Sequence, residues 1–98
     1  MSAPLFIGDE LTAAGYRLAG ARIRVTGDED PAELLAWGRD QSPLVMVGAD
    51  LAGRLPPETL EAALRSVTPL VVVVPDAGGA ARPRDLAGWM REQLGVSA

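Results

Sequence analysis

Two long apolar runs constrain the fold of this chain most strongly. They are PLVMVGAD at residues 43–50 and PLVVVVPD at residues 69–76. A strand of a parallel sheet is covered by helices on both faces, and for this reason it is hydrophobic almost throughout. Both runs match that pattern. They therefore predict two strands of a parallel sheet that has helices on both faces.

The rest of the chain alternates strands with helices around these two runs. LFIGD at residues 5–9 indicates another buried strand, and in ARIRVTG the residues Arg22 and Arg24 alternate with apolar ones, as in an edge strand. Helical patterns cover residues 11–20, 28–41, 55–67 and 82–95. This order predicts the α/β class: one Rossmann-like, flavodoxin-like domain spanning residues 1–98, with a four-stranded parallel sheet in the order 2-1-3-4 and right-handed crossovers.

Helical spacing and capping signals predict how these helices begin, end and face the sheet. Gly20 marks the end of the first helix, and Asp30 is the expected N-cap of the second, with Pro31 in its first turn and Glu33 as capping-box partner. The side chains expected to face the sheet from the first and third helices are Leu11, Ala14, Gly15, Leu18, Leu60, Ala63, Leu64 and Val67.

The two tryptophans fit the same periodicity. Trp37 comes three residues after Leu34, and Trp89 comes three residues after Leu86. Residues three apart lie on one side of a helix. We therefore expect both tryptophans to complete the core, rather than to form a binding site for a ligand.

The composition removes many kinds of chemistry. The chain contains no Cys, no His and no Lys, which excludes thiol chemistry, the commonest general base and zinc ligand, and the lysine of a P-loop. A net charge of -4 gives no general attraction to nucleic acid. No apolar run approaches the ~18 residues of a membrane span, and no basic segment precedes the first apolar run. We expect a cytosolic protein that does not insert into a membrane.

The segment GDELTAAGYRLAG raises the question of a phosphate site. Gly15 and Gly20 have P-loop spacing, but Ala and Arg follow where Lys and Ser/Thr are required. We therefore interpret Gly15 as a point where helix and sheet approach closely. Tyr16 and Arg17 should then project outward. An exposed Tyr–Arg pair is typical of an interface anchor, although single exposed aromatic residues are also ordinary.

Three carboxylates stand at or just past the predicted carboxyl ends of strands, where parallel sheets commonly bind ligands. They are Asp9, Asp50 and Asp76. The pattern is similar to a response-regulator receiver, with Asp9 and Glu10 as the acidic pair, Asp50 as phosphoacceptor and a magnesium ion. A receiver also needs a lysine after a fifth strand. The alternative, which we prefer, is that Asp9 caps the first helix and the other two are turn residues.

The segment IGDELTAAGYRLAGARI resembles the opening of the F subunit of V-type and archaeal A-type rotary ATPases. That family typically has a strand, then Gly-Asp, a short variable piece, and a helix end of the form G-[FL]-x-L-A-G, matched here by residues 15–20. The runs LVMVGAD and PLVVVVPD and the segment Gly88-Trp89-Met90-Arg91 extend the resemblance over essentially the whole chain.

The resemblance implies a non-catalytic central-stalk subunit, or rotor subunit, with no catalytic, cofactor-binding or metal-binding residues of its own. Such a protein docks on the coiled coil of the D subunit and acts through it on the catalytic head and membrane ring of a proton- or sodium-translocating ATPase. It is cytoplasmic and peripheral to the membrane. Many family members continue into a further C-terminal helix, which we do not expect in a sequence that ends at Ala98.

Two functions remain open from the sequence. The first is the rotor subunit, for which the expected partner-binding residues are Tyr16, Arg17, Arg22 and Arg24. The alternative is a receiver-like signalling module that uses Asp9, Glu10 and Asp50 with magnesium.

Overall fold

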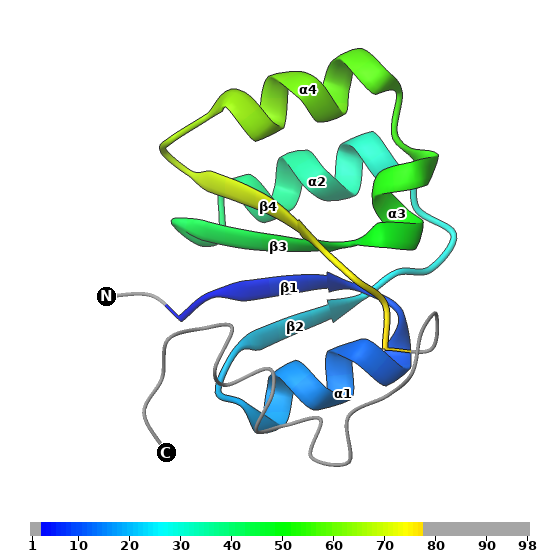
Figure 1. The fold of residues 1–98 in the computed structure, drawn as a ribbon, viewed down its shortest axis with the longest axis vertical. Coiled ribbons are helices and arrows are strands. Elements are labelled where there is room, and N and C mark those ends of the chain that lie inside the picture. The colour runs from blue at the N-terminus through cyan, green and yellow to red at the C-terminus, as the bar shows by residue number, and fades with distance from the viewer. Residues whose placement is uncertain (1–2, 78–98) are drawn as a thin grey trace.

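The fold is known from a computed structural model, which describes residues 3–77 (Figure 1). The elements in chain order are β1 (Leu5–Gly8), α1 (Glu10–Leu18), β2 (Arg22–Val25), α2 (Pro31–Arg39), β3 (Leu44–Gly48), α3 (Ala49–Arg54), α4 (Pro57–Arg65) and β4 (Leu70–Val74). The expected helix at residues 82–95, which includes Trp89, lies outside the described residues. The short helix α3, directly after β3, was not expected from the sequence.

The four strands form one parallel sheet in the order β2-β1-β3-β4, which confirms the predicted topology. In the central register Leu5 lies opposite both Arg22 and Val45, and Val45 lies opposite Val71. The strands β2 and β4 form the two edges. The arginine-bearing strand is thus an edge strand, as its alternating pattern predicted.

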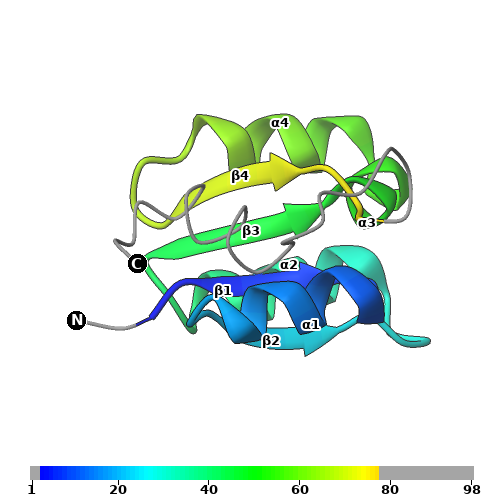
Figure 2. The ribbon, with the colours of Figure 1, turned by 60° about the horizontal axis from the view of Figure 1, so that its bottom comes forward.

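Helices lie on both faces of the sheet, as expected. Figures 1 and 2 show α1 on one face and α2, α3 and α4 on the other. Successive residues of a strand point to opposite faces, so the sheet contributes to two cores. On the face of α2 to α4 the main members are Leu5, Ile7, Leu34, Leu35, Val45, Val47, Leu51, Ala63 and Val71. On the α1 face they are Phe6, Ala13, Tyr16, Ala19, Ala21 and Met46.

The inward face of α1 differs from the prediction. Leu11 and Leu18 are 39% and 69% exposed, whereas Tyr16 is fully buried. The Tyr16 ring stacks on Phe6 with centroids 4.9 Å apart and an interplanar angle of 20°. The physical reason is that an aromatic ring buries more apolar area than a leucine and finds a flat partner in Phe6. The small residue Ala13, on the same face, lets the helix approach the sheet.

The position of α2 is set by a glycine. A Cβ added to Gly38 would lie only 2.5 Å from Ile7 Cδ1, so the backbone of α2 rests directly on the sheet at this point. The neighbouring Trp37 consequently turns outward and is 42% exposed. The prediction that Trp37 belongs to the core is therefore wrong, while Leu34 is buried as expected.

The last described helix also differs in part from the prediction. Ala63 is buried and Leu60 packs against the same core, as expected. However, α4 ends at Arg65, so Val67 lies in the connection to β4 and is 83% exposed. Leu64 is also exposed, because α4 contacts the sheet only along the side that carries Leu60 and Ala63.

The helix termini follow the sequence signals. Asp30 Oδ2 accepts the Glu33 backbone N–H at 3.1 Å, which confirms the cap of α2. Gly20 has a φ of +104°, a conformation that favours glycine, and it follows the C-cap of α1 as predicted. Within residues 3–77, no helix has the length and hydropathy required to cross a membrane.

Candidate functional site

Two of the three predicted carboxylates meet at the carboxyl end of the sheet. Asp9 caps α1, with its Oδ2 accepting the Thr12 N–H at 3.0 Å. Asp76 follows β4, and its Oδ2 accepts the Asp50 N–H at 2.9 Å. The other oxygen of each, Oδ1, is buried and has no hydrogen-bond partner among the described residues. We call Asp9 and Asp76 together the acid corner.

The pKa values of the acid corner move in opposite directions. Burial, followed by the charges of Asp9 and Asp50, raises the pKa of Asp76 above 3.8, and the Asp50 N–H offsets this only in part. Burial also acts to raise the pKa of Asp9, but hydrogen bonds from Thr12 and Asp76 outweigh it and lower that pKa below 3.8. Asp76 is therefore the side chain of the pair that binds a proton more readily.

The third carboxylate, Asp50, points elsewhere. It lies in the first turn of α3, its side chain is exposed, and its Oδ2 lies 3.4 Å from Nε of Arg54. The receiver-like arrangement of Asp9, Glu10 and Asp50 around one ion is therefore not formed. In the described part of the chain, no group of three or more carboxylate or other metal-ligating side chains is placed to hold a metal ion.

The preferred alternative for the carboxylates is confirmed for Asp9 and for Asp76, which lies in the loop after β4, and is wrong for Asp50. Asp9 is the N-cap of α1, as expected. Asp50 is helical, and Asp76 accepts a hydrogen bond from the first turn of α3. Asp50 differs from the prediction because the chain enters α3 immediately after β3, which also exposes the N–H groups of α3 to the end of β4.

Thr12 is a polar residue of this region that the sequence analysis missed. It is fully buried, and its Oγ1 accepts the Ala77 N–H at 2.9 Å. Its position three residues after the N-cap, within the apolar face of α1, is the signal that would have identified it. Thr12 joins the start of α1 to the chain that leaves β4.

The four predicted partner-binding residues differ in their exposure. Tyr16 is part of the core, so the prediction that it is exposed is wrong. Arg17 and Arg22 are exposed, and Arg24 is half-buried. Arg22 and Arg24 lie in edge strand β2, and Arg17 lies in α1 on one face of the sheet.

Arg24 is engaged by its own neighbours. Its guanidinium carbon lies 5.8 Å from the centroid of the Trp37 ring, and its Nη2 lies 2.9 Å from Glu29 Oε2. A hollow of about 370 Å³ surrounds this group and is lined by Arg24, Glu29, Glu33, Leu34 and Trp37. A cation over the face of an exposed tryptophan holds both side chains in place.

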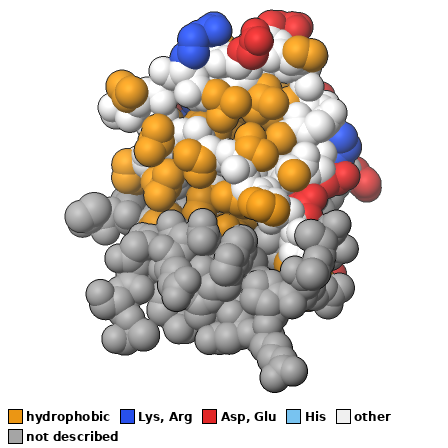
Figure 3. Space-filling model, viewed as in Figure 1, with side chains coloured by type: hydrophobic (Ala, Val, Ile, Leu, Met, Phe, Trp, Pro, Cys, Tyr) orange, Lys and Arg blue, Asp and Glu red, His pale blue; other side chains and the backbone are white. Residues whose placement is uncertain are grey.

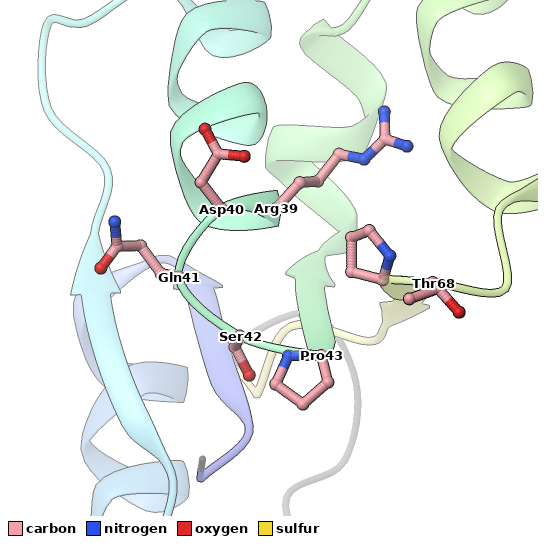
Figure 4. A pocket seen from close by; sticks show the side chains of 7 residues that line it. Arg39, Asp40, Gln41, Ser42, Pro43 and Thr68 are labelled. Carbon is pink, nitrogen blue, oxygen red and sulfur yellow. The ribbon is translucent and has the colours of Figure 1, made fainter. Parts of the chain in front are cut away.

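A second hollow of about 270 Å³ lies at the opposite end of the sheet from the acid corner (Figure 4). Its walls are the end of α2, the connection to β3 and the start of β4, with the side chains of Arg39, Asp40, Gln41, Ser42, Pro43, Thr68 and Pro69. The Ser42 hydroxyl lies within donating distance of the backbone oxygens of Ala3 (2.9 Å) and of Leu44 in β3 (3.0 Å). It therefore serves to hold the loop.

A hydrophobic surface extends over α4 and β4. Figure 3 shows apolar side chains gathered on the face where Figure 1 shows these elements. The exposed large hydrophobic residues of α4, β4 and their connection are Leu64, Val67, Leu70 and Val73. As β4 is also an edge strand, this is the more apolar of the two edges of the sheet.

Comparison with known proteins identifies the family. A search of curated proteins gave no match. The family model of the ATP synthase (F/14-kDa) subunit matches residues 5–88, which include all four strands and all of the described helices. The match covers most of the chain, and the parallel sheet agrees with the fold that the resemblance implied. The chain belongs to the family of the ATP synthase (F/14-kDa) subunit, which is the F subunit of V-type and archaeal A-type rotary ATPases.

Proposed function

We propose that this protein is a non-catalytic rotor subunit in the central stalk of a V/A-type, proton- or sodium-translocating ATPase. It docks on the coiled coil of the D subunit and couples rotation to ATP synthesis or hydrolysis. Its place is cytoplasmic and peripheral to the membrane. The observation that carries this proposal is the family match over residues 5–88.

The chemistry of the chain supports a structural role. It has no Cys, His or Lys, and its carboxylates bond backbone N–H groups rather than converging on a cleft. Two cores, one on each face of the sheet, make the domain rigid. A subunit that transmits torque needs this rigidity and a docking surface, and it needs no nucleophile.

The β2 edge is the docking surface that we favour. Arg17 and Arg22 are exposed beside it, and arginine is enriched among the residues that dominate binding energy. Tyr16 supports these residues only from inside, through its stack on Phe6. The partner on this edge is a long helix of the D-subunit coiled coil, which lies along the strand and contacts both arginines.

The test measures binding of the purified protein to the cognate D subunit by calorimetry. We expect a 1:1 complex, and about tenfold weaker binding for the Arg17→Ala/Arg22→Ala variant, since a tenfold loss corresponds to about 1.4 kcal/mol. Arg65→Ala, at an exposed position at the end of α4, is the matched control and should bind like the wild type. Absence of any complex would refute the rotor function. Equal binding of all three proteins would retain the function but exclude the β2 edge.

A second measurement tests the non-catalytic part. Addition of ATP and magnesium to the isolated protein should release no phosphate and no heat of binding. Turnover that disappears in an Asp9→Asn variant would contradict the proposal.

A further inference from the structure

The acid corner contains two buried carboxylate oxygens that have no hydrogen-bond donor among residues 3–77. In each carboxylate one oxygen accepts a hydrogen bond from a backbone N–H group. The donor is Thr12 for Asp9 and Asp50 for Asp76. Oδ1 of each is buried and, in residues 3–77, unpartnered. A buried acceptor without a donor is costly. A single proton placed between the two oxygens would satisfy both, because a protonated carboxyl group donates one hydrogen bond.

The topology explains why these two side chains meet. Strand β3 lies between β1 and β4. Helix α1 begins just after the carboxyl end of β1 and α3 at the carboxyl end of β3, at the same edge of the parallel sheet. The N-cap of α3 is Gly48, which has no side chain to accept a hydrogen bond. Asp76 accepts the N–H of Asp50 instead, although the two residues are 26 positions apart in the sequence. A Cβ on Gly48 would lie 2.9 Å from Asp76 Oδ1 and 3.5 Å from the Cα of Gly8. Gly48 thus makes room for the Asp76 carboxyl group.

The surrounding charges favour one negative charge here and oppose two. The N-terminus of α1 attracts an anion. Asp50 of α3 adds a further negative charge that acts on Asp76, and Glu10, the first residue of α1, is exposed. Arg54 of α3 is paired with Asp50. Because Asp9 acts on Asp76 through its charge and a side-chain hydrogen bond, a negative charge on Asp9 disfavours ionisation of Asp76.

We propose that Asp9 and Asp76 together bind one proton, carried by Asp76 and donated to Asp9 Oδ1, and that this proton fastens the end of β4 to the start of α1. Asp9 keeps the negative charge because the Thr12 backbone and side chain already donate to it. The Ala77 N–H to Thr12 Oγ1 bond of 2.9 Å is a second link at the same junction. Because Thr12 bonds both Asp9 and Ala77, the charge of the acid corner controls how strongly Ala77 is bound to α1. Acidification strengthens the contact between the end of β4 and the start of α1, and loss of the proton weakens that contact.

The test is a pH titration of the full chain by NMR, in which side-chain carboxyl carbons and backbone amides are observed together. We expect Asp76 to titrate above 3.8 and Asp9 below it, and the Ala77 amide to change with the midpoint of Asp76. The proposal is wrong if both carboxyl groups titrate independently near 3.8, or if Ala77 does not respond.

Two variants keep the caps and change only the proton. In Asp76→Asn the amide oxygen still accepts from Asp50, and the amide nitrogen donates permanently to Asp9. The Ala77 signal should then stay near its acidic position at every pH. In Asp9→Asn, which keeps a good N-cap, the midpoint of Asp76 should fall. Asp28→Asn, in an exposed loop, is the matched control and should leave both midpoints unchanged. A pH-dependent Ala77 signal in Asp76→Asn would overturn the proposal.

Discussion

The hydroxyl group of Tyr16 offers a sharp test of the structure. The ring is fully buried against Phe6, and the Oη atom is buried with no hydrogen-bond partner in the described part of the chain. An unsatisfied buried hydroxyl costs about 1–3 kcal/mol. Tyr16→Phe removes only this group and keeps the ring, so we expect it to stabilise the protein by about 1 kcal/mol, or roughly 4–8 °C in Tm for a domain of this size.

Two further changes at Tyr16 give the scale of the effect. Tyr16→Ala removes the ring and should cost about 3–5 kcal/mol, as for other large-to-small changes of buried aromatic residues. Trp37→Ala is the matched control, because Trp37 is the larger aromatic residue but is 42% exposed. It should cost clearly less than Tyr16→Ala. Urea unfolding followed by circular dichroism measures all three variants.

The same hydroxyl also has a pH signature. Burial raises the pKa of Tyr16 above 10.0. The folded-state pKa is thus higher than the unfolded one, so the contribution of Tyr16 to stability is complete below 10.0 and is lost as the pH rises through the folded-state pKa. Tyr16→Phe should not show this loss.

The assay is unusually clean in this chain. Tyr16 is its only tyrosine, and the chain has no Lys or Cys that would titrate in the same range. Ultraviolet absorbance of the tyrosinate therefore reports Tyr16 alone, and circular dichroism on the same sample reports unfolding. A midpoint at 10.0 with the fold intact would refute the burial of this residue, as would a Tyr16→Phe variant less stable than the wild type.

Three other predictions concern the backbone of the helices and the acid corner. In Gly38→Ala the new Cβ would lie 2.5 Å from Ile7 Cδ1. The overpacking cost of about 1–3 kcal/mol should exceed the ~1 kcal/mol gained in helix propensity, so the variant should be less stable than the wild type. Ile7→Val removes Cδ1 and should cancel part of this cost in a double-mutant cycle. Gly20→Ala meets no atom within 4 Å but must adopt a φ of +104°, and should cost about 1–2 kcal/mol of unfolding free energy, with Gly20→Asn less affected. The stability contribution of the acid corner should be greatest between the lowered pKa of Asp9 and the raised pKa of Asp76, a window that contains 3.8, because the Asp9 part is lost as pH falls and the Asp76 part as pH rises; chemical unfolding at a series of pH values checks this against Asp76→Asn.

The sheet was predictable because its signal is strong and local. The runs at residues 43–50 and 69–76 are hydrophobic throughout, and the arginines of β2 mark an edge. With only right-handed parallel connections allowed, few strand orders remain. The order β2-β1-β3-β4 then follows from the edge position of β2 and was correctly predicted.

The orientation of the helices was less predictable, because neighbouring residues compete for the inward position. In α1 the apolar residues are spread around the helix, so both a Leu11–Leu18 face and a Tyr16 face fit the spacing. The choice depends on Phe6, which is distant in sequence and offers a stacking surface. In α2 the choice between Trp37 and Gly38 depends on the close approach to Ile7. Periodicity places a stripe on a helix to within one residue, and here one residue decides which aromatic side chain is buried.

The acid corner was half predictable. A parallel sheet gathers the residues that follow its strands at one edge, so the grouping of Asp9, Asp50 and Asp76 could be inferred from the sequence. Which two would pair depended on α3, whose six residues carry no strong helical pattern. Because that helix begins directly after β3, it turns the Asp50 side chain toward Arg54 and presents its N–H to Asp76.

The burial of Tyr16 also changes how binding experiments on this protein should be interpreted. In the docking that we propose, Arg17 and Arg22 contact the partner, and Tyr16 acts only through the stability of α1 on the sheet. Tyr16→Phe should therefore raise the unfolding free energy and leave the affinity for the D subunit unchanged. Arg17→Ala/Arg22→Ala should weaken the binding of the D subunit and leave the unfolding free energy nearly unchanged, since exposed side chains contribute little to stability. Measuring both quantities on both variants separates the core from the interface, and a Tyr16→Phe variant that binds more weakly despite its higher stability would place the tyrosine hydroxyl back at the partner surface.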